Sequence, residues 1–210
     1  MTTATLPELT TSPPKPTALA ECEPAWDVAR LFPNQGVWSK YDYLDLPGNR
    51  LVEYDNGRIE VLPMPSIRHQ VVLGNIFVSL RVHVQSHELG TVLCAPMPLL
   101  VAQLKFREPD IVFTRSAAPE ESDGDKYLGN AELVSEGASN RKRDLIDKRA
   151  DYAKAGITEY WLVDPEPQEV TVLELQGGEY VELGPFGLSD VVRSTVVPGF
   201  EIPVAKVFAK

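Results

Sequence analysis

The chain has 210 residues, of which 43% are hydrophobic and 24% are charged, and its formal net charge is −10. This composition is typical of a globular domain with a sizeable core and excludes a largely disordered chain. The acidic balance argues against a broadly basic nucleic-acid-binding surface, although a bound divalent cation would reverse the sign of an acidic site.

The first residues differ from the rest of the chain. Residues 1–20 are rich in Thr, Pro and Ala without hydrophobic periodicity, so we expect a disordered tail followed by a single domain over residues 21–210. Residues 1–17 lack the apolar segment of a signal peptide, and no apolar run reaches the roughly 20 residues of a membrane-spanning helix. Cys22 and Cys94 are too few for a disulfide framework or a zinc site. We therefore expect a cytoplasmic protein without a membrane anchor.

Residues 51–62 predict a β-hairpin. Two apolar runs flank an Asn56-Gly57 pair, which suits the positive φ angles of a tight turn. Ser66 then suits the N-cap of a long helix that runs to about Glu88. Every fourth position in this helix is apolar, which predicts a stripe facing the core: Val72, Ile76, Leu80 and Val84.

The remaining elements alternate between strands and one further helix. Strands are expected at 91–95, 98–102, 105–114 and 161–163, a charged helix from about Arg141 to Ala155, a second hairpin from 169–175 and 179–183, and an extended segment at 196–203 that covers an edge. The order of these elements predicts an α/β (α+β) domain with a mixed sheet.

Two acidic residues interrupt or border apolar strands. Asp110 follows Pro109 and precedes Ile111-Val112-Phe113, and Glu132 directly precedes Leu133-Val134. A carboxylate in such a place must face solvent, find a partner or bind a cation. Oxygen ligands on neighbouring strands are what Mg²⁺ prefers, with water completing its octahedron.

The charged helix carries Asp144, Lys148 and Tyr152 at intervals of four residues, so these side chains are expected on one face. Taken alone, the spacing predicts an ordinary ion pair worth about 0.2–0.5 kcal/mol. Beside two carboxylates, however, Lys148 would orient an attacking water or stabilise charge developing on a phosphate.

Other charged residues have two interpretations each. His69 would contact substrate or stabilise the helix start, and Glu53 on the first hairpin would either join the acidic site or face solvent. Arg141, Lys142 and Arg143 form a basic cluster, which would be a solvated helix face or a contact to nucleic acid.

Several of these segments together resemble the Uma2 family (the DUF820 group) of restriction endonuclease-like proteins, which belongs to the PD-(D/E)xK nuclease superfamily. The matching segments are 52–59, His69, 107–113, 135–152 and Gly156-Ile157-Thr158-Glu159-Tyr160-Trp161-Leu162-Val163-Asp164-Pro165. The last of these is the most specific. The resemblance covers roughly residues 40–205.

The resemblance implies a restriction-endonuclease-like mixed sheet flanked by helices, with an N-terminal hairpin, and a Mg²⁺-dependent DNA endonuclease activity. Asp110 is then the Asp of the Pro-Asp motif, which binds the metal together with Glu132, and Lys148 is the catalytic lysine. The supporting residues are Glu53, His69, Asp144 and Tyr152, and the DNA contacts are Arg141, Lys142 and Arg143. A homodimer would suit cutting of both DNA strands.

One departure from the family pattern concerns the strand before the charged helix. The family shows Asp-Leu-Val-Val-Glu-Val-Val-Ser there, whereas residues 131–137 read as about four residues shorter. If the gap precedes Glu132, this residue is the metal-binding glutamate; if it follows Val134, that glutamate is missing. The second case leads to the alternative function, a catalytically degenerate nuclease fold that serves as a binding or assembly module.

Overall fold

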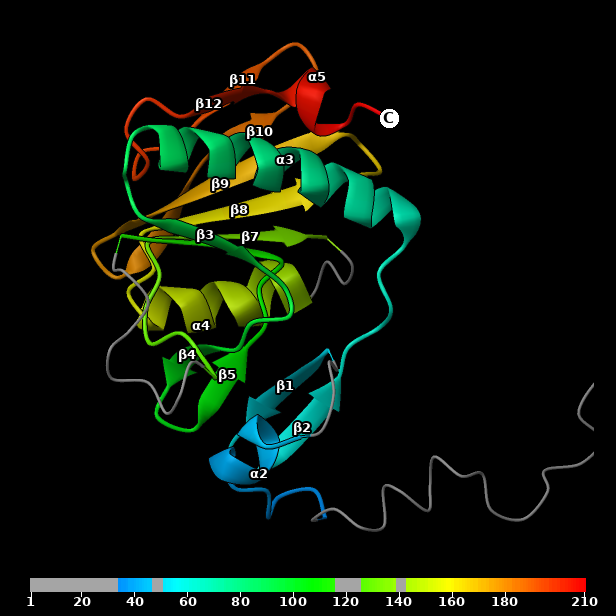
Figure 1. Cartoon of the computed structure of the whole chain (residues 1–210), viewed down its shortest axis with the longest axis vertical. Coiled ribbons are helices and arrows are strands. Elements are labelled where there is room, and N and C mark those ends of the chain that lie inside the picture. Colours follow the sequence, from blue (N-terminus) through cyan, green and yellow to red (C-terminus); the bar gives the residue numbers. More distant parts are fainter. Residues whose placement is uncertain (1–33, 47–50, 116–125, 139–142) are drawn as a thin grey trace, which may run out of the picture. The chain divides into compact units, whose positions relative to one another are not determined.

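The computed structural model describes residues 34–46, 51–115, 126–138 and 143–210, except for the side chains of 143–145 (Figure 1). The expected tail at 1–20 lies outside these ranges. Residues 35–210 form one compact unit. Its sheets and helices confirm the α/β class with a mixed sheet. None of the described helices is long and apolar enough to cross a membrane.

An antiparallel four-stranded sheet contains the predicted hairpin. The strands lie in the order β2 (Arg58–Val61), β1 (Val52–Asp55), β5 (Lys105–Arg107) and β4 (Leu99–Ala102). The turn between β1 and β2 has positive φ at Asn56 (47°) and Gly57 (83°), as the Asn-Gly pair predicts. A short helix, α2 (Lys40–Leu44), precedes the hairpin and is capped by Ser39.

A six-stranded sheet forms the centre of the unit. Its strands are, in order, β10 (Glu179–Phe186), β9 (Glu169–Gln176), β8 (Glu159–Asp164), β7 (Leu133–Gly137), β6 (Ile111–Thr114) and β3 (Thr91–Cys94). The β7–β8 pair is parallel, and the other pairs of this sheet are antiparallel. The crossover from β7 to β8 contains a π-helical segment, η1 (Arg143–Lys148), that continues into helix α4 (Arg149–Lys154).

The single strand predicted at 105–114 is wrong. The chain instead forms β5 in the four-stranded sheet and β6 in the six-stranded sheet. Pro109 has no N–H to donate to a strand ladder, so pairing stops at Arg107 and resumes at Ile111. Glu108 and Asp110 lie between the two strands, where the chain passes from the four-stranded sheet to the six-stranded sheet.

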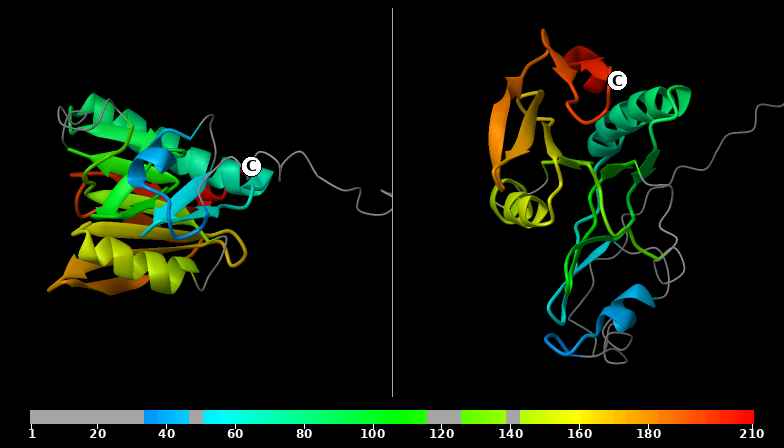
Figure 2. Two further views of the ribbon diagram at one scale, coloured as in Figure 1. Left: turned by 90° about the horizontal axis from the view of Figure 1, so that it is seen from below. Right: turned by 90° about the vertical axis from the view of Figure 1, so that its left-hand side faces the viewer.

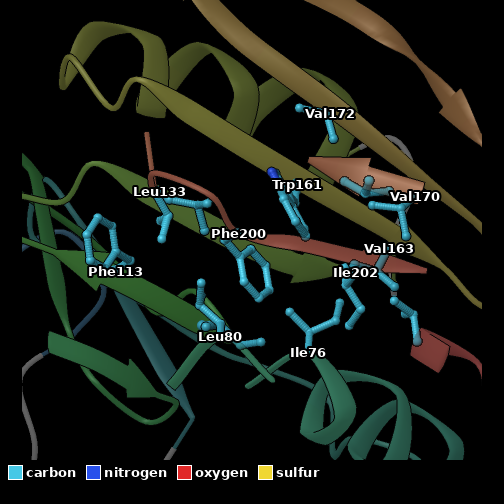
Figure 3. Packing of buried hydrophobic residues seen from close by; sticks show 14 of the residues in the cluster. Ile76, Leu80, Phe113, Leu133, Trp161, Val163, Val170, Val172, Phe200 and Ile202 are labelled. Carbon is cyan, nitrogen blue, oxygen red and sulfur yellow. The ribbon is translucent and has the colours of Figure 1, made fainter. Parts of the chain in front are cut away.

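Helices cover both faces of the six-stranded sheet (Figures 1 and 2). Helix α3 (Ile67–Ser86) lies on one face together with α5 (Val204–Val207) and the small sheet of β11 (Val191–Arg193) and β12 (Glu201–Pro203), while α4 lies on the other. A hydrophobic core lies on each face of the sheet, and strand β8 contributes to both, because Trp161 points towards α3 and Tyr160 towards α4. Figure 3 shows Ile76 and Leu80 of α3 packed near Trp161.

Helix α3 begins and packs as its sequence predicts. The Ser66 hydroxyl accepts a hydrogen bond from the backbone N–H of His69 at 3.1 Å, which caps the first turn. The four residues of the predicted core stripe, Val72, Ile76, Leu80 and Val84, are all buried. The apolar period therefore predicts both the helix and the face that it buries.

Strand β10 forms one edge of the six-stranded sheet, and its pairing with β9 is irregular. The register shifts between Glu182 and Pro185, where Gly184 has a φ of 126°. A proline and a bulge are typical of edge strands, because neither continues a regular ladder.

Candidate active site

The candidate site lies where β6 begins and β7 ends. These two strands are antiparallel, and Ile111 pairs with Ser135. The next residues outward along the two strands are Asp110 and Glu136, which therefore lie near each other at this end of the sheet. Glu136 faces the crossover helix, whereas Asp110 contacts His69 of α3. Because β7 is parallel to β8, this is also the carboxyl end of the parallel pair, where α/β folds commonly bind ligands.

Glu136 is buried and contacts two side chains from the crossover helix. Its Oε1 accepts hydrogen bonds from Lys148 Nζ at 2.7 Å and from the Tyr152 hydroxyl at 2.6 Å. Lys148 and Tyr152 are four residues apart, so both reach the same carboxylate. Burial raises the pKa of Glu136 to about 8; the Lys148 ammonium opposes this increase, whereas the Asp110 carboxylate adds to it. Burial, followed by the Glu136 charge, also raises the pKa of Tyr152 well above its usual value.

Asp110 is held from two directions. Its Oδ1 lies 3.1 Å from His69 Nε2, and its Oδ2 accepts a hydrogen bond from the backbone N–H of Gly137 at 2.8 Å. A Cβ on Gly137 would lie 2.6 Å from the His69 ring, so the glycine leaves the space that the imidazole occupies. His69 and Gly137 thus fix the orientation of the Asp110 carboxylate from α3 and from β7.

Glu53 connects the four-stranded sheet to the same group. This residue of β1 is buried, and its Oε2 accepts a hydrogen bond from Arg107 Nη1 at 2.6 Å. Its Oε1 lies 3.5 Å from Lys148 Nζ. The Lys148 ammonium is therefore placed between Glu53 and Glu136, one carboxylate from each sheet.

Arg107 links this group to helix α4. Its Nε and Nη2 donate to Asp151 Oδ2 at 2.9 Å and 2.6 Å, and Lys105 Nζ donates to Asp151 Oδ1 at 3.0 Å. A polar cavity of about 560 Å³ opens beside these residues. Charged residues predominate in its lining: Glu53, Asp55, Arg58, Glu60, Lys105, Arg107, Asp147 and Asp151.

Glu108 adds a further buried carboxyl group at the corner between β5 and β6. Its Oε1 accepts a 3.4 Å hydrogen bond from the Tyr43 hydroxyl, and no partner for its Oε2 is found in the part of the chain that the structure describes. Burial raises the pKa of Glu108 to about 7, against the lowering effect of the Val52 backbone and with a further increase from Glu53. In the described part of the site, carboxyl side chains therefore outnumber lysine and arginine side chains.

The structure brings together five of the residues expected from the sequence: Asp110, Lys148, Glu53, His69 and Tyr152. It places Glu132 elsewhere, four residues before Glu136 on β7 and about 13 Å away along the strand. There Glu132 Oε2 accepts a hydrogen bond from the backbone N–H of Arg115 at 2.9 Å.

Four other expected residues have no described side chain. Asp144 and Arg143 lie in η1, where the structure describes only their backbone, and Arg141 and Lys142 lie outside the described residues. The predicted DNA contacts and the predicted role of Asp144 therefore stay predictions.

The sequence pattern points to Glu132 rather than Glu136 when a gap is placed in residues 131–137. Residues 132–139 read Glu-Leu-Val-Ser-Glu-Gly-Ala-Ser, which matches Asp-Leu-Val-Val-Glu-Val-Val-Ser without any gap if Glu132 stands for the Asp. The Glu-x-x-Ser pattern is then Glu136 to Ser139 rather than Glu132 to Ser135. In this alignment no residue is missing, and β7 has the length that the pattern requires.

The donor set at the site suits a divalent cation bound by few protein ligands. Asp110 and Glu136 offer oxygen ligands on adjacent strands, and Mg²⁺ is commonly held by one or two carboxylates together with water and substrate phosphates. Among the described residues, no cluster of three or more His, Cys, Asp or Glu side chains has the arrangement of a metal site. The residues present thus fit an ion that shares its ligands with solvent and substrate.

The mixed sheet, with its helices on both faces, is a nuclease-like α/β fold. A solved structure from Anabaena variabilis, described as a "putative nuclease belonging to DUF820", superposes with a TM-score of 0.66 at 20% sequence identity. The match covers 80% of this chain and 96% of that chain. Residues 38–205 match the model of the Uma2 family, described as "Putative restriction endonuclease", and the chain belongs to that family. This match confirms the resemblance seen in the sequence. A search of curated proteins finds no match.

Proposed function

We propose that this Uma2 protein is a Mg²⁺-dependent endonuclease that hydrolyses phosphodiester bonds in DNA. The family description supports nuclease activity. The observation that carries the proposal is the contact of Glu136 with Lys148, next to Asp110 at the end of the sheet. An acidic pair and a lysine in this arrangement suit metal-assisted hydrolysis.

Asp110 and Glu136 would hold the cation. When bound, such an ion lowers the pKa of its water and offsets the negative charge of a phosphate. The raised pKa of Glu136 supports this role, because a buried carboxylate near Asp110 lacks enough positive charge in the protein alone. Glu136 takes the role that the sequence had suggested for Glu132.

The remaining residues would orient the reacting groups. Lys148 presents its ammonium beside Glu136 and Glu53, where it would position the attacking water or stabilise charge on the phosphate. The Tyr152 hydroxyl would hold Glu136 in place, and His69 would hold Asp110. Glu53 is itself fixed by Arg107 and would keep Lys148 within the site.

The DNA would be contacted by Arg141, Lys142 and Arg143, which lie five to seven residues before Lys148 along the chain. A local basic cluster suits a protein whose formal net charge is −10, because broad electrostatic attraction is not available to it.

Cleavage of supercoiled plasmid DNA in Mg²⁺ tests the proposal. The wild-type chain should convert the plasmid to nicked or linear products, and Asp110→Asn should not, because its amide binds a cation poorly. Calorimetric titration with Mg²⁺ should likewise detect binding to the wild type that is lost in Asp110→Ala. Circular dichroism of each variant would show that the fold is retained.

The second candidate function is a binding or assembly protein that keeps the fold without cutting. The lack of a cluster of three or more metal-binding side chains among the described residues favours it. Absence of both cleavage and Mg²⁺ binding, with DNA present or not, would support this function and contradict the endonuclease.

A further inference from the structure

The outer face of α3 carries an apolar stripe that the described part of the chain leaves exposed. Four aliphatic residues of this 20-residue helix are exposed: Ile67 is 85% exposed, Val71 40%, Val78 60% and Val82 58%. At 3.6 residues per turn, all four fall on one narrow face. That face is opposite the buried stripe of α3, so the helix is apolar on two sides. We call these four residues, with Gly74 between them, the outer stripe.

The outer stripe is symmetric about its centre. Ile67 and Val82 lie equally far from a midpoint between Gly74 and Asn75, and so do Val71 and Val78. A two-fold axis through this midpoint would place a second α3 antiparallel to the first. Ile67 would then meet Val82 of the second copy, and Val71 would meet its Val78. A two-fold interface requires such a self-complementary patch, whereas an unrelated partner does not.

Gly74 provides a second, independent observation. Glycine inside a helix costs about 1 kcal/mol relative to alanine. A Cβ on Gly74 would meet nothing within 4 Å in this structure, so no described contact within the chain requires a glycine there. Its small size would instead let a second helix approach closely at the symmetry axis, where interaxial distance depends on the side chains in contact.

The charged residues beside the outer stripe are held against their own chain. Arg68 donates to the backbone carbonyl of Pro165, and the Arg81 guanidinium lies over the ring of Phe77 at 5.7 Å. Neither charge belongs to the outer stripe, which is uncharged along its length.

We propose that the outer stripe of α3 is a homodimer interface, formed with α3 of a second copy in an antiparallel arrangement. The helix is about 30 Å long, enough to carry a continuous contact. The exposed parts of its four aliphatic side chains amount to on the order of 200 Å² per chain. This is less than the apolar share of a standard interface of about 800 Å² per partner, so we expect a weak dimer that dissociates on dilution.

Sedimentation equilibrium of the full chain, from about 1 to 200 µM, tests the dimer. The wild type should approach twice its 23.2 kDa mass at the upper end. Val71→Lys should remain at the monomer mass, because two buried ammonium groups would oppose association. Val181→Lys is the matched control: this valine is 44% exposed on β10, and its replacement should leave the dimer intact. Thermal unfolding followed by circular dichroism should show that both variants fold.

Charge pairs then test the antiparallel register. Val71→Lys combined with Val78→Glu should restore the dimer, since each lysine would face a glutamate of the other copy. Val71→Lys combined with Val78→Lys should not. A wild type that stays monomeric at 200 µM, a dimer that survives Val71→Lys, or a failure of the Lys–Glu pair to restore association would each overturn the proposal. Binding of a monomeric chain to anionic lipid vesicles, lost in Val71→Glu, would assign the stripe to a lipid surface and overturn the dimer proposal as well.

Discussion

Two buried glutamates on neighbouring strands differ in the hydrogen-bond donors that surround their carboxylates. Glu159 at the start of β8 and Glu136 near the end of β7 are both almost inaccessible to solvent. Glu159 is surrounded by donors from β8 and the segment 194–196. These donors are Trp161 Nε1, Ser194 Oγ at 2.9 Å, Thr195 N at 2.8 Å, Thr195 Oγ1 at 3.0 Å and Val196 N at 3.0 Å.

Among the described residues, Glu136 has fewer hydrogen-bond partners than Glu159 for the same degree of burial. Lys148 and Tyr152 both donate to its Oε1, and the pKa of this carboxyl group is raised to about 8. A buried carboxylate is stable when donors satisfy it, as at Glu159, where it fixes a turn of the fold. The contrast indicates that Glu159 is structural and that Glu136 is arranged to receive further positive charge.

The largest expected effect is on catalysis. Replacing the proposed metal ligand by Glu136→Gln should reduce plasmid cleavage about a thousandfold, comparable to the loss of a main charge-stabilising group. Glu132→Gln is the matched control, with the same change four residues earlier, directly before β7. It should retain activity within about twofold. Equal losses in both variants, or a loss only in Glu132→Gln, would contradict the assignment of Glu136.

The second expected effect is on stability. Glu159→Ala leaves several buried donors without an acceptor and should lower the free energy of unfolding by about 3 kcal/mol. Urea unfolding of the variant and the wild type measures this change. Cleavage per folded molecule should be unaffected, so a stable Glu159→Ala protein without activity would remove the distinction between the two glutamates.

The third effect concerns pH. Because the pKa of Glu136 is about 8 without a bound ion, protons compete with Mg²⁺ below that pH. Raising the pH from 6.5 to 8.5 should therefore strengthen Mg²⁺ binding on the order of tenfold by calorimetry. Weaker binding at the higher pH would show that the carboxylate does not need to lose a proton.

The smallest effect tests the contact between His69 and Asp110. Gly137→Ala introduces a Cβ 2.6 Å from the His69 ring and should displace it, reducing cleavage about fivefold. If the alanine acts only through His69, then adding it to a His69→Ala variant should cause no further loss. Additive losses would indicate that Gly137 has another role.

Local patterns in the sequence predict much of the fold. The Asn56-Gly57 pair predicts the first hairpin, and the period of apolar residues predicts α3; both are confirmed. The division of residues 105–114 between two sheets was not predicted, because either sheet offers a partner to such a strand. Only the contacts of the folded chain decide between them.

The residues of the candidate site are harder to predict from the sequence than the fold is. The Pro-Asp motif points to Asp110 and the helix spacing to Lys148, but Glu136 required the correct alignment of one strand. The Arg107–Glu53 ion pair joins residues that are 54 positions apart, and no local sequence pattern predicts such a contact. Even the Gly-Ile-Thr-Glu-Tyr-Trp segment, the most specific of the resemblance, contains the structural Glu159 rather than a member of the site.

The irregular edge strand β10 has a consequence for solubility. An open sheet edge invites other chains to add strands, which leads to aggregation. The register shift before Pro185 and the charged Glu179 and Glu182 make β10 a poor template for such growth. Concentrated solutions of this protein should therefore resist amyloid-like stacking along β10.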